Sequence, residues 1–289
     1  MNRRDLLKHA LIATSALVLN PLASFAAGTD DTQQRLTALE RKHGGRLGVA
    51  VWDTGNGRRI GHRADERFMM CSTFKLLLAA ATLARVDRGA ERLDRRLVFQ
   101  QSDVLSYAPV TRLHVGAPGM TIADLCKAAV SLSDNTAANV LLANLGGPSA
   151  VTAFARQLGD RITQLDRNEP ALNYPALDHV SDTTTAASML HNLHTLVLGD
   201  ALSVASRTLL TQWLRDTTTG LTRLRAGLPA GWMAGDKTGS AGDATNDVVI
   251  IWPPKRKPLL VSAYYAAATL DDDARSAVLA DVGRIVAAM

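Results

Sequence analysis

A serine and a lysine, Ser72 and Lys75, stand three residues apart at the start of the apolar run "CSTFKLLLAA". On a helix, positions with this spacing share one face, so the two side chains point the same way. A serine hydroxyl is a weak nucleophile until a neighbouring base takes its proton, and a lysine amine can be that base. A cation in the first helical turn costs about 0.3–1 kcal/mol, so Lys75 needs a compensating partner. The pair by itself is also consistent with an exposed lysine.

Two further polar clusters contain residues that could do chemistry. In "SDN", which falls between two predicted helices, Ser133 could relay a proton and Asn135 could hold an amide. Ser, Asp and Asn are also preferred helix N-caps, which is the alternative interpretation. In "KTGS", Lys237 and Thr238 on a strand could bind a carboxylate, and the glycine would let a ligand backbone lie close. The alternative there is a polar strand end.

The hydrophobic pattern indicates a scaffold with strands at both ends of the chain and helices between them. We expect the two ends to pair into one antiparallel sheet, flanked by the terminal helices, with an inserted all-helical subdomain: an α+β fold, or α/β sandwich. The site is expected in the cleft between the two parts, and Ser72 lies at that boundary. The predicted strands are 47–52, 58–62, 232–235 with the residues directly after it, 248–252 and 259–266, and the predicted helices are 32–43, 73–86, 122–132, 135–145, 149–158, 183–196, 203–215 and 272–289.

The same pattern divides the chain. A segment at 1–26 has the features of an export signal, and 27–289 is expected to form one domain. Within that domain, 27–66 and 215–289 are assigned to the α/β subdomain, and 67–214 to the helical subdomain.

The three clusters occur in the order S-x-x-K, S-D-N, K-T-G, which is the established signature of class A β-lactamases and penicillin-binding proteins. A fourth stretch, "RNEPALN", begins at Arg167 and resembles the omega-loop of class A β-lactamases, and Asp182 matches the acid that closes the neck of that loop. Penicillin-binding proteins lack the glutamate of this loop and stay acylated, whereas Glu169 is present here. Over about residues 30–289 the chain therefore resembles the class A serine β-lactamases. Arg167 and Asp182 are expected to hold the loop in place.

The resemblance implies hydrolysis of penicillins and cephalosporins in two steps, without a cofactor. Ser72 would attack the β-lactam carbonyl and become acylated, while Ser133 would pass a proton to the departing nitrogen. Either Lys75 or Glu169, acting through a water, would take the serine proton, and which of them does so is disputed for this family. A water activated by Glu169 and held with Asn173 would then release the product. Glu169 is also expected to be the opposite charge that keeps Lys75 in place.

The resemblance also implies how the substrate is held. The backbone N–H groups of Ser72 and Ser240 would form the oxyanion hole, and one such donor is typically worth about 2.7–4 kcal/mol. The "KTGS" segment would bind the substrate carboxylate, with Arg223 or Arg275 as a second cation. The residues assigned to substrate binding are Tyr107 at the cleft edge, Asn135 on the substrate's side-chain amide, Asn173, Arg223, Lys237, Thr238, Gly239 and Ser240.

Two cysteines raise the question of a disulfide. Some relatives that hydrolyse carbapenems join a cysteine at the position of Cys71 to one where this chain has Ala241. Other members pair a cysteine at the position of Cys126 with one where this chain has Ala79. Both of these bridges are therefore excluded. A Cys71–Cys126 bond stays open, and two free buried thiols are expected.

Composition and the N-terminus indicate an exported protein without a nucleic-acid-binding surface. The 289 residues carry a formal net charge of +5, with no basic cluster typical of nucleic-acid binding. Arg3, Arg4 and Lys8 precede a short apolar run and an A-x-A-type cleavage site. A Tat-like or Sec signal is therefore expected, followed by a periplasmic or secreted protein without a stable membrane anchor. The resemblance to the class A β-lactamases implies a monomer that takes small-molecule β-lactams as substrates.

Two other functions share the same motifs. A penicillin-binding D,D-peptidase is disfavoured by Glu169, and a penicillin-sensor domain is disfavoured because no membrane segment is visible after residue 26. A metal-dependent lactamase is also disfavoured. His191 and His194 share a helical face, but the sequence offers no evident third ligand, so no metal is expected.

Overall fold

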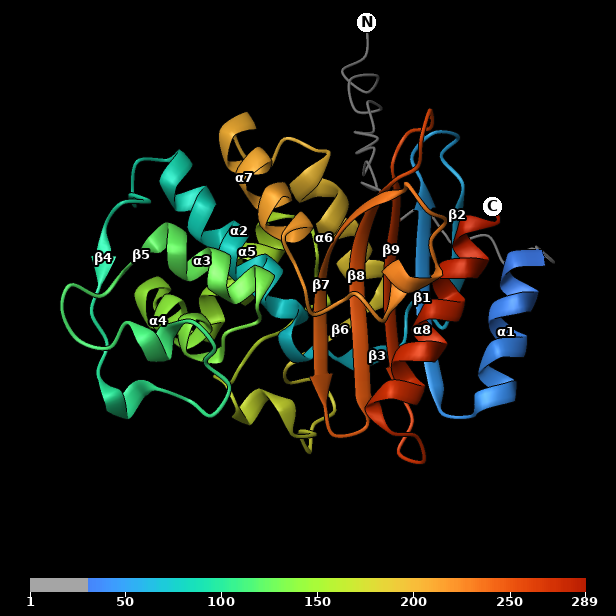
Figure 1. Ribbon diagram of the computed structural model, residues 1–289, viewed down its shortest axis with the longest axis horizontal. Coiled ribbons are helices and arrows are strands. Elements are labelled where there is room, and N and C mark those ends of the chain that lie inside the picture. Colours follow the sequence, from blue (N-terminus) through green and yellow to red (C-terminus); the bar gives the residue numbers. More distant parts are fainter. Residues whose placement is uncertain (1–30) are drawn as a thin grey trace, which may run out of the picture.

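Five antiparallel strands form the central sheet, in the order β2-β1-β9-β8-β7 (Figure 1). The computed structural model describes residues 31–289, so the predicted export signal at 1–26 lies outside the described residues. Leu47 near the start of the chain lies opposite Tyr265 near its end, which confirms the antiparallel sheet built from both chain ends. The strands are β1 (Arg46–Asp53), β2 (Arg59–His62), β7 (Met233–Ala241), β8 (Ala244–Trp252) and β9 (Leu259–Ala266).

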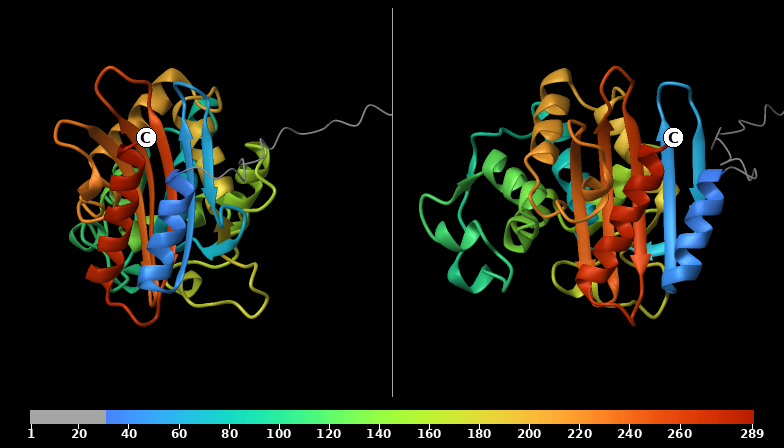
Figure 2. Two further views of the ribbon diagram at one scale, coloured as in Figure 1. Left: turned by 90° about the vertical axis from the view of Figure 1, so that its right-hand side faces the viewer. Right: turned by 45° about the vertical axis from the view of Figure 1, so that its right-hand side comes forward.

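One face of the sheet is covered by the terminal helices α1 (Asp31–His43) and α8 (Asp272–Ala287), which lie side by side (Figure 2). Successive side chains of a strand point to opposite faces, so alternate residues form this layer. Val49 of β1 and its partner Ala263 of β9 belong to one buried apolar cluster with Leu36 of α1. This layer anchors the sheet and leaves the other face for the helical region.

The opposite face of the sheet packs against helices from the middle of the chain. α6 (Ala186–Val197) contacts β1, β8 and β9, and Val248 and Leu260 share a buried core with the helical region. This arrangement confirms the predicted α+β fold with an inserted helical part. The other helices there are α2 (Phe74–Asp87), α3 (Ile122–Ser131), α4 (Asn135–Leu145), α5 (Pro148–Gln157) and α7 (Val204–Arg215).

Helix α2 runs through the middle of the helical region, surrounded by other helices (Figure 1). Every residue from Phe74 to Ala84 is buried, as expected of a helix that is apolar on all sides. The turn that carries Ser72 immediately precedes this buried helix, so the serine sits on a rigid support. Within residues 31–289, no helix is both long and apolar enough to span a bilayer.

The structure corrects some of the predicted elements. The helix predicted for 183–196 begins at Ala186, because Thr183–Thr185 forms strand β6, paired with β3 (Arg67–Met69). β-Branched threonines favour extended backbone, and the partner strand lies far away in the sequence. Two short strands, β4 (Arg96–Leu97) and β5 (Met120–Thr121), were not predicted either. The short 3-10 helices are η1 (Cys71–Thr73), η2 (Gln101–Asp103), η3 (Thr111–Leu113), η4 (Ala171–Asn173) and η5 (Leu224–Gly227).

Candidate active site

The predicted nucleophile, Ser72, lies in the 3-10 turn η1, where strand β7 passes very close to the backbone. A Cβ atom on Gly239 of β7 would lie 2.8 Å from the carbonyl oxygen of Met70 and 3.2 Å from the backbone nitrogen of Ser72. Only glycine fits this contact, because real Cβ atoms do not approach backbone atoms so closely. The contact brings the backbone of β7 beside that of Ser72. The Asn246 amide of β8 fixes the same turn by donating to Met69 O at 2.9 Å and Met70 O at 3.2 Å.

The Lys75 amine lies at the centre of the predicted catalytic residues and is fully buried. Its Nζ donates to Ser72 Oγ at 3.0 Å and lies 3.0 Å from Glu169 Oε1. It also donates to the backbone oxygen of Ser133 at 2.8 Å and to Asn135 Oδ1 at 2.5 Å. Burial lowers the pKa of Lys75, and the Glu169 carboxylate beside it opposes that shift. The unfavourable position of the Lys75 charge in the first turn of α2 is therefore compensated by the Glu169 carboxylate and by the hydrogen bonds to its amine.

A second buried amine reaches the same cluster from the sheet. Lys237 Nζ donates to Ser133 Oγ at 3.1 Å, and Lys75 Nζ lies 3.4 Å from the same hydroxyl. Burial holds the pKa of Lys237 well below its usual range, and repulsion from Lys75 adds to the effect. One serine hydroxyl therefore contacts two buried amines, and burial lowers the pKa of each.

The helix N-cap interpretation of "SDN" applies to Asp134 alone. Its Oδ1 accepts from the backbone N–H of Ala137 at 2.9 Å, and its Oδ2 accepts from the backbone of Val110 and Thr111 at 2.9 Å each. Asp134 therefore caps α4 and ties it to the preceding loop. Its neighbours Ser133 and Asn135 do not cap the helix and instead contact Lys75. Both interpretations of this motif hold, each for different residues.

Glu169 is buried at the edge of the cluster and is held by two asparagines. Asn173 Nδ2 donates to Glu169 Oε2 at 2.6 Å. Asn139 of α4 makes two hydrogen bonds with the backbone of Glu169. Its Nδ2 donates to Glu169 O at 2.8 Å, and its Oδ1 accepts from the Glu169 N–H at 3.0 Å. Glu169 Oε1 accepts from Ser72 Oγ at 3.4 Å. Asn139 was missed by sequence reasoning, although it ends the stretch "SDNTAAN", one helical turn beyond Asn135.

The neck of the omega-loop is closed by Asp182 and Arg167. Asp182 is fully buried, and its Oδ1 accepts the backbone N–H groups of Asp166 at 2.8 Å and Arg167 at 3.0 Å. Its Oδ2 accepts from Arg167 Nε at 2.5 Å, and Arg167 Nη2 donates to Tyr174 O at 2.7 Å. Hydrogen bonds to a charged group are stronger than those between neutral groups, so the Asp182 carboxylate holds the two ends of the loop together.

Of the two candidate cations, Arg223 reaches the "KTGS" segment. It donates to Gly239 O at 3.0 Å through Nη1 and to Ser240 Oγ at 2.5 Å through Nη2. Arg275 instead donates to Thr245 Oγ1 at 3.0 Å and Gly242 O at 3.0 Å, where it fastens α8 to the strand ends. Arg223 is therefore the second cation beside this segment, and the Arg275 alternative is not supported by these contacts.

Two further side chains border the site. Thr238 Oγ1 is 2.6 Å from Thr219 Oγ1, a partner that no sequence motif singled out. Tyr107, predicted at the cleft edge, has a half-exposed side chain, and its backbone oxygen accepts from the N–H of Asn135 at 3.0 Å. No local pattern pointed to Thr219, because its partner is contributed by a distant strand.

The cysteines and histidines take no part in the cluster. Cys71 and Cys126 are free and buried, and burial raises the pKa of each thiol to about 12. His191 Nε2 contacts Leu158 O at 2.8 Å, and the His194 ring stacks on Trp52 at 3.9 Å between centroids. Within residues 31–289, no group of three or more His, Cys, Asp or Glu side chains could hold a metal ion.

Comparison with known proteins agrees with this geometry. Residues 31–289 match the model of the Beta-lactamase enzyme family. The chain is 47% identical over 295 residues to Beta-lactamase L2 of Stenotrophomonas maltophilia, covering 98% of this chain and 97% of that protein. It is 44% identical over 287 residues to Beta-lactamase CTX-M-8 of Citrobacter amalonaticus, covering 98% of each. An ancestral class A β-lactamase of known structure matches with a TM-score of 0.86 and 58% identity, covering 88% of this chain and 98% of that one. The chain therefore belongs to the β-lactamase enzyme family, as a class A serine β-lactamase.

Proposed function

We propose that this enzyme hydrolyses the β-lactam amide of penicillins and cephalosporins through an acyl-enzyme on Ser72, and so confers antibiotic resistance. One observation carries the proposal: Lys75 Nζ lies 3.0 Å from both Ser72 Oγ and Glu169 Oε1, inside a buried cluster. The nucleophile, an amine and a carboxylate are thereby within proton-transfer distance of one another. No cofactor enters the chemistry.

In acylation, Ser72 Oγ attacks the lactam carbonyl and gives up its proton. Lys75 at 3.0 Å and Glu169 at 3.4 Å are both in reach of that proton, so the acceptor stays open between them. The backbone N–H groups of Ser72 and Ser240 stabilise the oxyanion. The C–N bond then breaks, and Ser133 donates a proton to the leaving nitrogen. Lys237 and Lys75, both bonded to Ser133, can replace that proton.

In deacylation, Glu169 takes a proton from a water that attacks the ester carbonyl. The ester C–O bond breaks, the proton returns to Ser72 Oγ, and the penicilloate or its cephalosporin counterpart leaves. Asn173 supports this step: its Nδ2 holds Glu169 Oε2 at 2.6 Å, while its buried Oδ1 has no hydrogen-bond partner among the described residues. A water between this amide oxygen and the carboxylate would satisfy it.

The substrate carboxylate binds at the end of β7, between the Lys237 amine, the hydroxyls of Thr238 and Ser240, and the Arg223 guanidinium. The Arg223 bond to Ser240 Oγ at 2.5 Å supports the inclusion of this cation. Gly239 is required for the close contact between β7 and η1. Asn135 orients the substrate's side-chain amide and Tyr107 forms the cleft edge.

The other candidate functions are a D,D-peptidase and a penicillin sensor, and both of these stay acylated after they react with penicillin. The position of Glu169, 3.4 Å from Ser72 Oγ, favours a turnover enzyme over either. All of the proposed groups come from one chain, which is consistent with a monomer. We place the enzyme in the periplasm or outside the cell, exported through the signal predicted at 1–26.

The test is an intact-mass time course of the purified protein with excess benzylpenicillin, following drug and protein together. The expected result is that the drug gains one water while the protein returns to its starting mass. In Glu169→Gln the expected result is a stable adduct, since the general base of deacylation is gone. Ser72→Ala is the control that should form no adduct. A stable adduct on the unmodified protein would replace the hydrolase with a sensor or peptidase.

A further inference from the structure

The segment between α7 and η5, residues 216–223, lies beside β7, which is an edge strand of the central sheet. Two threonines of this segment contact the strand. Thr217 Oγ1 donates to Asp236 O at 2.7 Å, and Thr219 Oγ1 lies 2.6 Å from Thr238 Oγ1. The second contact reaches a residue that the proposed mechanism places against the substrate carboxylate. Thr219 itself has no part in that mechanism so far.

The same segment supplies a polar partner to each of the two hydroxyl groups proposed to bind that carboxylate. Arg223 Nη2 donates to Ser240 Oγ at 2.5 Å. A guanidinium has donors only, so the Ser240 oxygen accepts this bond and its own proton is free for the substrate. Thr219 takes the corresponding place beside Thr238. Unlike the arginine, however, a threonine hydroxyl can either donate or accept.

A bound carboxylate would decide which of the two threonines donates. Thr238 is only 4% exposed, and within residues 31–289 the bond to Thr219 is the one hydrogen bond that its hydroxyl makes. A carboxylate accepts hydrogen bonds and cannot donate them, so Thr238 must give its single proton to the substrate. Its oxygen can then only accept from Thr219. Thr219 is partly exposed, so solvent can satisfy the lone pairs of its own oxygen.

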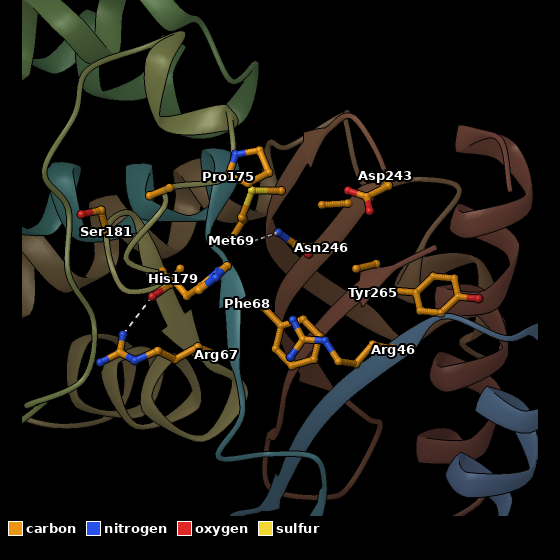
Figure 3. Close-up of a pocket in the computed structure, with 14 residues that line it drawn as sticks. Arg46, Arg67, Phe68, Met69, Pro175, His179, Ser181, Asp243, Asn246 and Tyr265 are labelled. Carbon is orange, nitrogen blue, oxygen red and sulfur yellow. Dashed lines mark hydrogen bonds between the residues drawn. The ribbon is translucent and has the colours of Figure 1, made fainter. Parts of the chain in front are cut away.

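The backbone around the site is held by contacts that do not involve Thr219. β7 pairs with β8 along its whole length, Met233–Ala241. Asn246 of β8 donates to Met69 O at 2.9 Å, just before the turn that carries the nucleophile. Figure 3, a close-up of the cavity that these two residues help to line, shows this bond. Removing the Thr219 hydroxyl should therefore leave the strand and the turn in place, and change the hydrogen bonding of Thr238 alone.

We propose that Thr219 is a positioning residue for substrate recognition. When substrate is bound, its hydroxyl donates to Thr238 Oγ1 and so directs the Thr238 proton to the substrate carboxylate. A chain of two hydroxyl groups that ends on an anion is strengthened, because each hydrogen bond polarises the next. Thr219 thereby favours substrates with an anionic group at this position over neutral ones. The inference rests on the proposed function, since that function supplies the carboxylate.

The test compares acylation by benzylpenicillin with acylation by its methyl ester, in which the carboxylate is neutral. Quench-flow with intact-mass detection gives the second-order rate constant of acylation for each compound. Thr219→Val keeps the branched shape and removes the hydroxyl. It should slow acylation by benzylpenicillin about three- to tenfold, the net effect of one hydrogen bond. Acylation by the ester should change by less than about twofold, because hydrogen bonds to a neutral group are weaker.

Two further variants separate this role from a structural one. Thr219→Ser keeps the hydroxyl and should acylate like the unmodified protein with both compounds. Thr218→Val removes a hydroxyl from the exposed neighbouring position and should also change neither rate. If Thr219→Val slows both compounds equally, the residue supports the strand and does not select the anion, and the proposal is wrong. Unchanged or faster acylation by benzylpenicillin in Thr219→Val also overturns it, the latter because Thr238 would then have been donating to Thr219.

The acylation readout keeps this inference apart from the proposed function. A stable adduct on the unmodified protein would count against hydrolysis, yet the ratio of the two acylation rates in Thr219→Val would still test the role of Thr219. Absence of any adduct on the unmodified protein would refute the proposed function, and with it the carboxylate on which the inference rests. Normal turnover by the unmodified protein, with no selective loss in Thr219→Val, would refute the inference alone.

Discussion

Lys75 Nζ and Glu169 Oε1 are 3.0 Å apart, and both side chains are completely buried. Helix α2 holds the lysine and the omega-loop holds the glutamate, so the ion pair joins two segments that are distant in the sequence. Two buried charges are expensive to desolvate, and their attraction repays that cost only with good geometry and further hydrogen bonds. Here Ser72, Ser133, Asn135 and Asn173 supply those bonds. The ion pair therefore contributes to the stability of the fold as well as to the proposed chemistry.

Removing one partner of this pair should destabilise the protein. Lys75→Met leaves the buried Glu169 charge uncompensated, which typically costs about 3–5 kcal/mol. The Lys75→Met/Glu169→Gln double variant removes both charges and should recover most of that loss. Urea unfolding of the four proteins in the cycle measures the coupling free energy. Additive effects in the cycle would show that the two side chains are not energetically linked.

Both Lys75→Met proteins should also lose acylation in single-turnover assays, and near-normal acylation would remove Lys75 from the mechanism.

The close approach of β7 to η1 gives a prediction about the oxyanion hole. Gly239→Ala would put a Cβ atom 2.8 Å from Met70 O, so the strand must move away from Ser72. The expected result is a fall of about 10²–10³-fold in kcat, the typical effect of losing one oxyanion donor. Ser240→Ala is the matched control, since it keeps the backbone N–H and removes only the hydroxyl. A Gly239→Ala enzyme with unchanged kcat would mean that the backbone contact does not position the donor.

The neck of the omega-loop should matter for deacylation and not for acylation. Asp182→Ala removes the acceptor of two backbone N–H groups and the Arg167 side chain. Hydrogen exchange of residues 166–180 should accelerate, because each hydrogen bond to a charged group contributes about 1.5–3 kcal/mol. Acyl-enzyme should accumulate with benzylpenicillin, since Glu169 is no longer held. Asp166→Ala, an exposed change in the same loop, serves as the comparison. Unaltered exchange together with unaltered turnover would contradict the assigned role.

Two buried carboxyl groups on the neighbouring strands β7 and β8 predict an unusual pH dependence of stability. Burial raises the pKa of Asp236 to about 6, against the opposing pull of Arg225, and burial also raises that of Asp247. A raised carboxyl pKa means that the folded state binds the proton more tightly than the unfolded state. The resulting stabilisation is fully present below about pH 4 and is lost as the pH rises through about 6.

Chemical denaturation between pH 4 and pH 8 measures this effect. The contribution of Asp236 to the free energy of unfolding should fall by about 1–3 kcal/mol across that range. Asp236→Asn should flatten this part of the profile, and Asp243→Asn, at a more exposed position after β7, should leave it as it is. A profile for Asp236→Asn that is parallel to that of the unmodified protein would show that Asp236 ionises normally.

Much of this protein can be read from its sequence because the relevant signals are local. Period-two and period-3.6 patterns depend only on neighbouring residues, and they placed β9 and α4 at the observed bounds. The order of the serine, lysine and glutamate motifs along the chain is enough to indicate the family without any information on contacts. The glycine in the third motif likewise indicates a close backbone contact at Gly239, although only the structure shows which atoms Gly239 contacts.

Tertiary structure decided what depends on partners far along the chain. Thr183–Thr185 is a strand because Arg67–Met69 lies beside it, a pairing that no local pattern contains. Arg223, and not Arg275, approaches Ser240 because the loop before β7 folds back along that strand, whereas α8 directs Arg275 to Thr245. Ser72 and Glu169 are 97 positions apart, and their meeting at 3.4 Å follows from how α2 and the omega-loop pack. Residue types and their order therefore indicate which reaction the protein can catalyse. Long-range packing decides which of these residues meet, because it brings groups together irrespective of their separation in the chain.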